Sequence, residues 1–156
     1  MTTIVVETRI SAPIEVCFDL ARDVDVHVST SSTTGERAVG GRTSGLLELG
    51  DVVTFEAVHF GIRQRLTSRI VEFDRPQRFV DEMVEGAFAS LRHTHEFFAE
   101  GSSVLMRDTL TWRSPLGPLG VIADLLFVRR HLYNYVVAKQ SDLKALAERT
   151  SGRVPG

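Results

Sequence analysis

The strongest constraint on the fold is a series of five stretches in which apolar and polar residues alternate. They occupy residues 52–60, 62–72, 79–86, 90–98 and 104–112. A period of two residues is typical of β-strands that bury one face. The turns between the stretches are too short for the crossover connections that parallel strands require. The pattern therefore predicts an antiparallel β-meander.

The chain before the meander begins with one more strand and then changes to helical spacing. Residues 3–10 alternate, whereas the following "SAPIEVCFDLARD" has Pro13 near its start and four residues at helical intervals: Ile14, Cys17, Phe18 and Ala21. We predict a short helix here and a second short helix after it. A Ser-, Thr- and Gly-rich loop follows, with one weak strand expected near residues 34–38.

After the Pro- and Gly-rich "RSPLGPLG" the chain continues to Arg149 without another Pro or Gly. Six apolar residues keep near-helical spacing: Leu119, Ile122, Leu126, Tyr133, Val137 and Leu146. This spacing predicts one long amphipathic helix from about Leu119 to Arg149. We expect a single domain over residues 1–150 and a flexible tail over residues 151–156.

Composition narrows the class of protein. A chain of 156 residues is the size of one domain, and its net charge of −2 gives no attraction to nucleic acid or to an anionic membrane. The first ten residues lack the regions of a secretory signal, and the single cysteine, Cys17, excludes an internal disulfide. These features favour a cytoplasmic protein with no nucleic-acid partner.

The order of elements is α+β, and the sheet has to curl around the long helix to bury both apolar faces. In this order, and in the stretches "GDVVTFEAVHFGI", "LTSRIVEFDRPQRFVDEMVEGAF", "LRHTHEFF" and "MRDTLTWRSPLGPLG", the sequence resembles small stand-alone bacterial members of the SRPBCC or START-like superfamily of polyketide cyclases and lipid-transport proteins. The resemblance implies a helix-grip fold, in which a curved antiparallel β-sheet wraps around a long C-terminal helix and two short helices follow the first strand. It also implies a cavity between sheet and helix for a lipid, polyketide or similar hydrophobic molecule.

The stretch "SLRHTHEFF" contains two histidines that the alternation turns toward this cavity. Leu91, His93, His95 and Phe97 share one face, and Leu and Phe favour the inner side. A tight hairpin around residue 101 then places Asp108 of the next strand directly opposite one of the two histidines. Opposed side chains have Cβ atoms about 5 Å apart, so a histidine to carboxylate hydrogen bond is expected.

Two other strands contribute polar residues to the same face. For residues 79–86 we favour the register in which Phe79 and Met83 point inward, which also brings Asp81 inside. His59 points inward from the first meander strand. It is three strands from His93, or about 14 Å along the sheet, so we expect it to line the cavity without contacting His93.

Four interpretations of His93, His95 and Asp108 remain open. They form a structural network, or they orient a polar group of a ligand, or a histidine backed by Asp108 acts as a general base for cyclase or dehydratase chemistry. The H-x-H spacing also suits a zinc site, but no convincing third ligand is evident, so we predict neither a metal nor a cofactor. The predicted ligand-binding residues are Phe55, His59, Leu66, Ile70, Asp81, Met83, Leu91, Phe97, Met106, Trp112, Leu126, Tyr133 and Val137.

The segment at residues 115–128 is apolar on nearly every side where it is helical, yet it is too short to span a bilayer. Burial under the loop, a contact in a homodimer, and a hydrophobic lip on the cavity are the alternatives. His131 is expected on the helix surface. The sequence as a whole predicts binding of a small hydrophobic molecule, with an enzyme of the cyclase or dehydratase kind as the alternative and no stable membrane insertion.

Overall fold

The computed structural model describes residues 1–30 and 34–152. The elements follow one another as β1 (Thr2–Ile10), α1 (Ile14–Ala21), α2 (Val24–Ser29), β2 (Arg37–Gly41), β3 (Val52–His59), β4 (Ile62–Asp74), β5 (Arg78–Glu85), β6 (Ser90–Glu100), β7 (Ser103–Arg113), α3 (Gly117–Ala123), the π-helical turn η1 (Asp124–Val128) and α4 (Arg129–Gly152). The five predicted meander strands and the two short helices are all present. The weak strand expected near residues 34–38 is β2, which begins three residues later.

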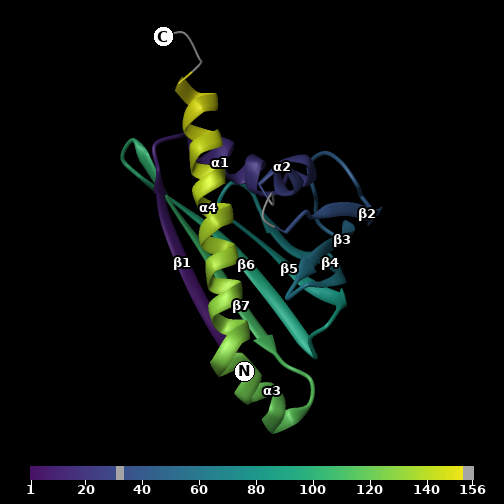
Figure 1. Cartoon of the computed structure of the whole chain (residues 1–156). Coiled ribbons are helices and arrows are strands. Elements are labelled where there is room, and N and C mark those ends of the chain that lie inside the picture. Colours follow the sequence, from purple (N-terminus) through teal and green to yellow (C-terminus); the bar gives the residue numbers. More distant parts are fainter. Residues whose placement is uncertain (31–33, 153–156) are drawn as a thin grey trace.

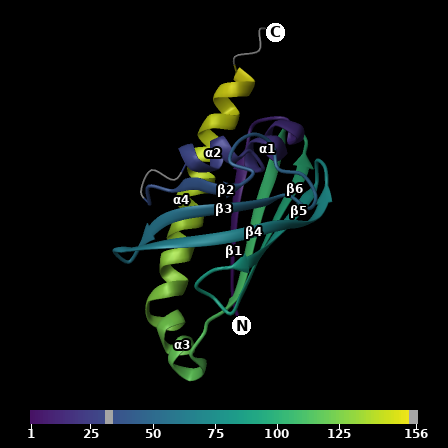
Figure 2. The ribbon, with the colours of Figure 1, turned by 90° about the vertical axis from the view of Figure 1, so that its right-hand side faces the viewer.

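The strands form one antiparallel sheet in the order β1-β7-β6-β5-β4-β3-β2. Strands β2 to β7 pair in chain order, and β1, the first strand of the chain, pairs with β7 along its whole length. Figures 1 and 2 show the sheet bending around one side of α4, with α1 and α2 closing its upper end. This is the α+β, helix-grip arrangement that the order of elements predicts.

Two clusters of buried side chains hold the sheet to the helices. Near α1, Phe18 makes edge contacts with Phe73, Phe79 and Phe97, at ring centroid distances of 5.3–5.5 Å. The second cluster lies between β1, β7 and α4 and contains Ile4, Val6, Leu110, Trp112 and Val136. The space between the two clusters is left for the cavity.

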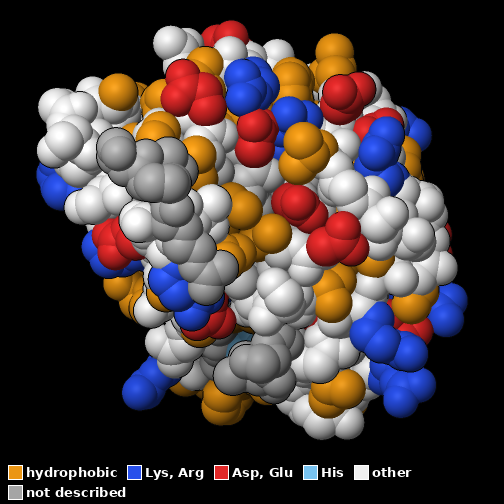
Figure 3. Space-filling model, turned by 90° about the horizontal axis from the view of Figure 1, so that it is seen from above, with side chains coloured by type: hydrophobic (Ala, Val, Ile, Leu, Met, Phe, Trp, Pro, Cys, Tyr) orange, Lys and Arg blue, Asp and Glu red, His pale blue; other side chains and the backbone are white. Residues whose placement is uncertain are grey.

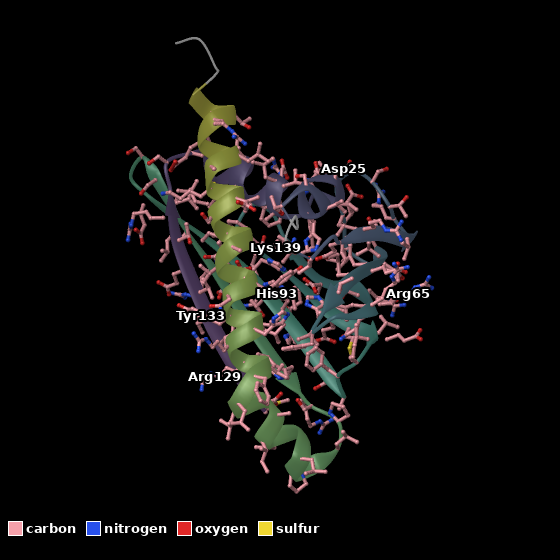
Figure 4. All side chains as sticks on the ribbon, in the orientation of Figure 1. Asp25, Arg65, His93, Arg129, Tyr133 and Lys139 are labelled. Atoms are coloured by element: carbon pink, nitrogen blue, oxygen red, sulfur yellow. The ribbon has the colours of Figure 1, made fainter. Side chains whose placement is uncertain are left out.

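The C-terminal helix differs from the prediction in its division and in the face that it buries. It is divided into α3, η1 and α4, and the residues of α4 that are buried are Val136, Gln140, Leu143 and Ala147. The predicted inner residues Leu126, Tyr133 and Val137 are 62%, 45% and 39% exposed, and Figure 4 shows Tyr133 on the side of α4 away from Lys139. The inner face of α4 carries polar residues, so the apolar periodicity pointed to the wrong side. A π turn also shifts the phase of a helix.

Helix α4 continues to Gly152, so residues 151 and 152, which were predicted to belong to a flexible tail, are helical. Residues 153–156 of that predicted tail lie outside the described residues. Among the described residues, no helix combines the length and the apolar character needed to cross a membrane.

Candidate functional site

A cavity of about 440 Å³ lies between the concave face of the sheet and α4. Its volume falls within the range of small-molecule sites, which is about 300–1,000 Å³. Apolar side chains from the sheet, α2 and α4 form most of its wall, among them Val53, Phe55, Ile70, Leu91, Leu110, Val128, Leu132 and Leu143. Polar side chains gather in a belt across its middle.

The sheet side of this belt is a chain of four residues, Asp81, His95, Asp108 and His93. The strand register places His95 opposite Asp108, as one of the two predicted pairings requires, and places Asp81 opposite His93. His95 Nε2 lies 2.8 Å from Asp81 Oδ2, and His95 Nδ1 lies 2.9 Å from Asp108 Oδ1. His93 Nε2 lies 2.8 Å from the same Asp108 oxygen. The four side chains therefore form one continuous network.

Packing and hydrogen bonds from α4 fix this network in place. The rings of His93 and His95 stack with their centroids 3.8 Å apart, and Phe79 stacks on the other face of His95 at 4.1 Å. Gln140 Nε2 donates to Asp108 Oδ2 at 2.6 Å, while Gln140 Oε1 accepts from Thr8 Oγ1 at 2.7 Å. Because Gln140 is buried and occupied at both ends, it joins the sheet to α4 through Asp108.

The neighbours of His95 hold it in its charged form. Burial alone would lower the pKa of His95, but its hydrogen bonds to Asp108 and Asp81, and their charges, outweigh that effect and raise the pKa to about 9. Burial would raise the pKa of Asp108, and its two histidine partners instead hold it well below its usual range. His95 is thus an imidazolium between two carboxylates. His93 donates from Nε2 to Asp108, and no described residue bonds to its Nδ1.

A second polar group, from α2, β2 and α4, completes the belt. His27 Nε2 and the Tyr135 hydroxyl both bond to the buried carboxylate of Glu36. Lys139 Nζ donates to the backbone oxygen of His27 at 2.8 Å. Burial lowers the pKa of Lys139 to about 8, although Glu36, Asp108 and Asp142 act in the other direction. Against the effect of burial, His27, Lys139 and Tyr135 lower the pKa of Glu36 to about 2.

A pair of histidines stands at the α3 end of the cavity. His59 Nδ1 lies 2.8 Å from His131 Nε2, and the ring of His131 also packs against Phe60 with the centroids 4.4 Å apart. Burial lowers the pKa of both histidines, and for His59 the neighbouring His131 lowers it further. His59 lines the cavity and makes no contact with His93, as predicted. The expectation that His131 lies on the helix surface is wrong, because it turns toward β3.

The structure brings ten of the predicted site residues to the cavity wall: Phe55, His59, Leu66, Ile70, Asp81, Leu91, His93, His95, Met106 and Asp108. Six others lie elsewhere. Phe97 and Trp112 are buried in the two side-chain clusters, and Met83 packs near Gly86 rather than on the wall. Leu126, Tyr133 and Val137 lie on the outer side of their helical segments, for the reason given above.

Several cavity residues had no signal in the sequence. His27 and Glu36 flank a Ser- and Thr-rich segment that reads as loop, and nothing local shows that either side chain reaches the cavity. Lys139 and Gln140 lie in a polar part of the helix that reads as solvent-facing. The sequence favoured the register of β5 that turns Asp81 inward, but it did not predict the hydrogen bond between Asp81 and His95.

Asp81, His93 and His95 also meet the spacing of a metal site, since one ligand atom from each lies within 4.8 Å of the others. Asp81 is the third ligand that the sequence lacked. Metal binding would, however, require His95 to lose a proton that two carboxylates stabilise.

No protein-family model matches the chain, and no curated protein matches it in sequence. Solved structures do match it over nearly its whole length. TTHA0849 from Thermus thermophilus is 22% identical with a TM-score of 0.78, over 96% of this chain and 99% of that one. The chain therefore shares the helix-grip fold of these structures.

Other helix-grip structures match at lower identity. Protein CV1439 from Chromobacterium violaceum is 14% identical with a TM-score of 0.72, and covers 94% of this chain and 96% of its own. Major latex-like protein 151 from Panax ginseng is 16% identical with a TM-score of 0.65, over 94% and 97% of the two chains. At these identities the likeness establishes the helix-grip fold, and function has to be argued from the site.

Proposed function

We propose that the protein binds a small, mainly apolar molecule in the cavity and holds a neutral polar group of that molecule at His93. The observation that carries the proposal is the combination of an apolar wall with one histidine, His93, whose Nδ1 bonds to no described residue. His95, Asp108 and Gln140 have their polar atoms occupied by one another and so support His93. Few, well-placed polar groups in an apolar cavity are typical of small-molecule sites.

The charges in the belt favour a neutral ligand over an anionic one. Three carboxylates, of Glu36, Asp81 and Asp108, face two cations, His95 and Lys139. Arg22 and Arg65 also border the cavity, but they pair with Asp19 and Glu56. A ligand carboxylate would therefore enter a region that already has an excess of one negative charge.

Binding is tested with Nile red, a neutral apolar dye whose fluorescence rises in apolar surroundings, and with mass spectrometry of solvent extracts of the purified protein. We expect saturable dye binding and displacement by medium-chain alcohols. Leu132→Trp narrows the cavity and should weaken binding, whereas Val137→Trp, which lies on the outer side of the same helix, should leave it unchanged. Equal dye binding by both variants would place the dye outside the cavity and overturn the proposal.

A second candidate function is general-base catalysis, and the His93 to Asp108 hydrogen bond favours it. A carboxylate that holds the Nε2 proton leaves Nδ1 able to accept a proton from a bound carbon acid or hydroxyl. The general base is then His93 alone, because His95 has both nitrogens occupied. Turnover of a cyclisable polyketone that survives His93→Gln would contradict this function, while dye binding by the same variant reports on the cavity independently.

A further inference from the structure

The largest exposed apolar surface of the described chain lies at the α3 end. Seven large side chains on the segment from residue 116 to residue 127 are 53–77% exposed: Leu116, Leu119, Val121, Ile122, Leu125, Leu126 and Phe127. Phe60 and Ile62, at the tip between β3 and β4, are 56% and 62% exposed. Soluble domains rarely leave so many large apolar side chains together in water without a partner. We call these nine residues the apolar end.

The apolar end surrounds the mouth of the cavity. Among the described residues of the cavity wall, the exposed ones are Phe60, Arg65, Ala87, Pro115 and Leu116. All five come from the β3–β4 hairpin, the β5–β6 turn and the segment that leads into α3. The cavity therefore meets solvent at the same end of the molecule as the exposed apolar side chains.

The segment that carries most of the apolar end has exposed charges of one sign only. Between Asp108 and Asp142 the only acidic residue is Asp124, and it is buried. Arg113, Arg129 and Arg130 are exposed, and none of them forms an ion pair within the described chain. Figure 4 shows Arg129 where α4 begins, beside α3. A protein with a net charge of −2 thus has a positive rim at this end.

The opposite end of the molecule has a different surface. Figure 3 looks down on it and shows acidic and basic side chains interspersed over the whole face, with apolar side chains scattered between them. Figures 1 and 2 show α3 protruding below the sheet at the other end, where no other element covers it. The combination of apolar side chains and a basic rim is local to the α3 end.

We propose that the apolar end docks on an anionic phospholipid bilayer and that the cavity exchanges its ligand with the membrane there. Helical segments with large apolar side chains and flanking arginines bind in this way, with the apolar side chains entering the acyl boundary and the cations meeting lipid phosphates. A second copy of the chain fits less well, because it would place the same three unpaired arginines opposite one another. The exchange step rests on the proposed ligand binding, whereas the docking step does not.

Docking is tested by flotation of the full chain with vesicles of phosphatidylcholine alone or of phosphatidylcholine with phosphatidylglycerol. We expect binding to the anionic vesicles that weakens steeply between about 0.05 and 0.5 M salt. Arg129→Gln with Arg130→Gln should weaken it about 30-fold at low salt. Leu119→Gln with Leu125→Gln should weaken it by at least about tenfold.

Matched controls remove the same groups at the other end of the molecule. Arg9→Gln with Arg149→Gln removes two exposed positive charges near the C-terminal end of α4, and Val39→Gln with Leu49→Gln removes two exposed apolar side chains. Both control variants should float as the wild type does. Thermal midpoints verify that every variant is folded, and the arginine variant keeps the test valid if the leucine variant does not fold.

Three results would overturn the docking. They are equal binding to neutral and anionic vesicles, loss of binding in the control variants to the same extent, and a dimer in solution that Leu119→Gln with Leu125→Gln dissociates, which would assign this face to a second copy. Ligand exchange is measured separately, as transfer of Nile red from loaded protein to vesicles. Vesicle binding without any dye binding by the protein would retain the docking and reject the proposed function.

Discussion

Two histidines that look equivalent in the sequence have different roles in the structure. His93 and His95 lie two residues apart on one face of β6, yet only His95 is held between two carboxylates. Alternation predicted the direction of both side chains, and hairpin geometry predicted Asp108 as a partner, because both depend only on local spacing. The role of Asp81 depends on the register between β5 and β6. The pairing of β5 with β4 contains bulges, and the sequence does not show this register.

At the residue scale we predict that His95 makes the stability of the protein depend on pH. Its pKa is raised from 6.5 to about 9, so its contribution is complete below pH 6.5 and is lost as the pH rises through 9. The contribution of His95 to the free energy of unfolding should fall by about 1–2 kcal/mol between pH 6.5 and pH 8. His27, His59 and His131, whose pKa values are lowered, offset part of this fall near pH 6.5. Lys139, whose pKa is lowered to about 8, acts in the opposite direction only above that pH.

Urea denaturation at several pH values checks this dependence. Asp81→Asn removes one partner of His95 and should flatten the curve between pH 6.5 and 8. Asp51→Asn, a substitution of a carboxylate that pairs with Arg42 far from His95, serves as the control and should keep the slope of the wild type. A wild-type stability that rises over this interval would show that His95 is neutral in the folded protein.

At the scale of elements, a single buried carboxylate joins the protruding α3 segment to the sheet. Asp124 Oδ1 accepts from Trp112 Nε1 at 3.1 Å and from the Ser114 hydroxyl, and Asp124 Oδ2 accepts from Thr2 Oγ1 at 3.1 Å. Asp124 begins the π turn η1, so the turn and these three bonds occur at the same place. The bonds hold the carboxylate inside while Leu125, Leu126 and Phe127 remain on the surface.

We predict that Asp124→Ala destabilises the protein by about 3 kcal/mol, because it leaves the buried indole N–H of Trp112 without an acceptor. Asp124→Asn keeps Oδ1 as an acceptor and should cost about 1 kcal/mol. Chemical denaturation followed by the fluorescence of Trp112, the single tryptophan, measures both. Equal losses for the two variants would show that the charge of Asp124, rather than its acceptor geometry, stabilises this junction.

At the scale of the whole molecule, the sequence predicts the elements whose residues have a regular spacing. It does not predict which distant residues come into contact in the fold. The meander, the short helices and the inward face of β6 follow from spacing, and the helix-grip fold follows from their order. The belt across the cavity does not, because Glu36 and Lys139 are about a hundred residues apart and each lies in a segment that reads as solvated. The inner face of α4 was predicted wrongly because the helix lines a polar belt. Lys139 and Gln140 therefore face the cavity, whereas Tyr133 and Val137 are exposed.

The excess negative charge of the belt gives a prediction about ligand choice. Wild-type protein should bind 1-decanol more tightly than decanoate, measured as displacement of Nile red at pH 7. Glu36→Gln keeps an acceptor for Tyr135 and removes one carboxylate, so the ratio of the two affinities should shift toward decanoate by about tenfold. Glu7→Gln, which removes a carboxylate paired with Arg107, should leave the ratio unchanged. Wild-type preference for decanoate would instead mean that Lys139 acts as the counter-ion of an anionic ligand, and the proposed neutral ligand would be wrong.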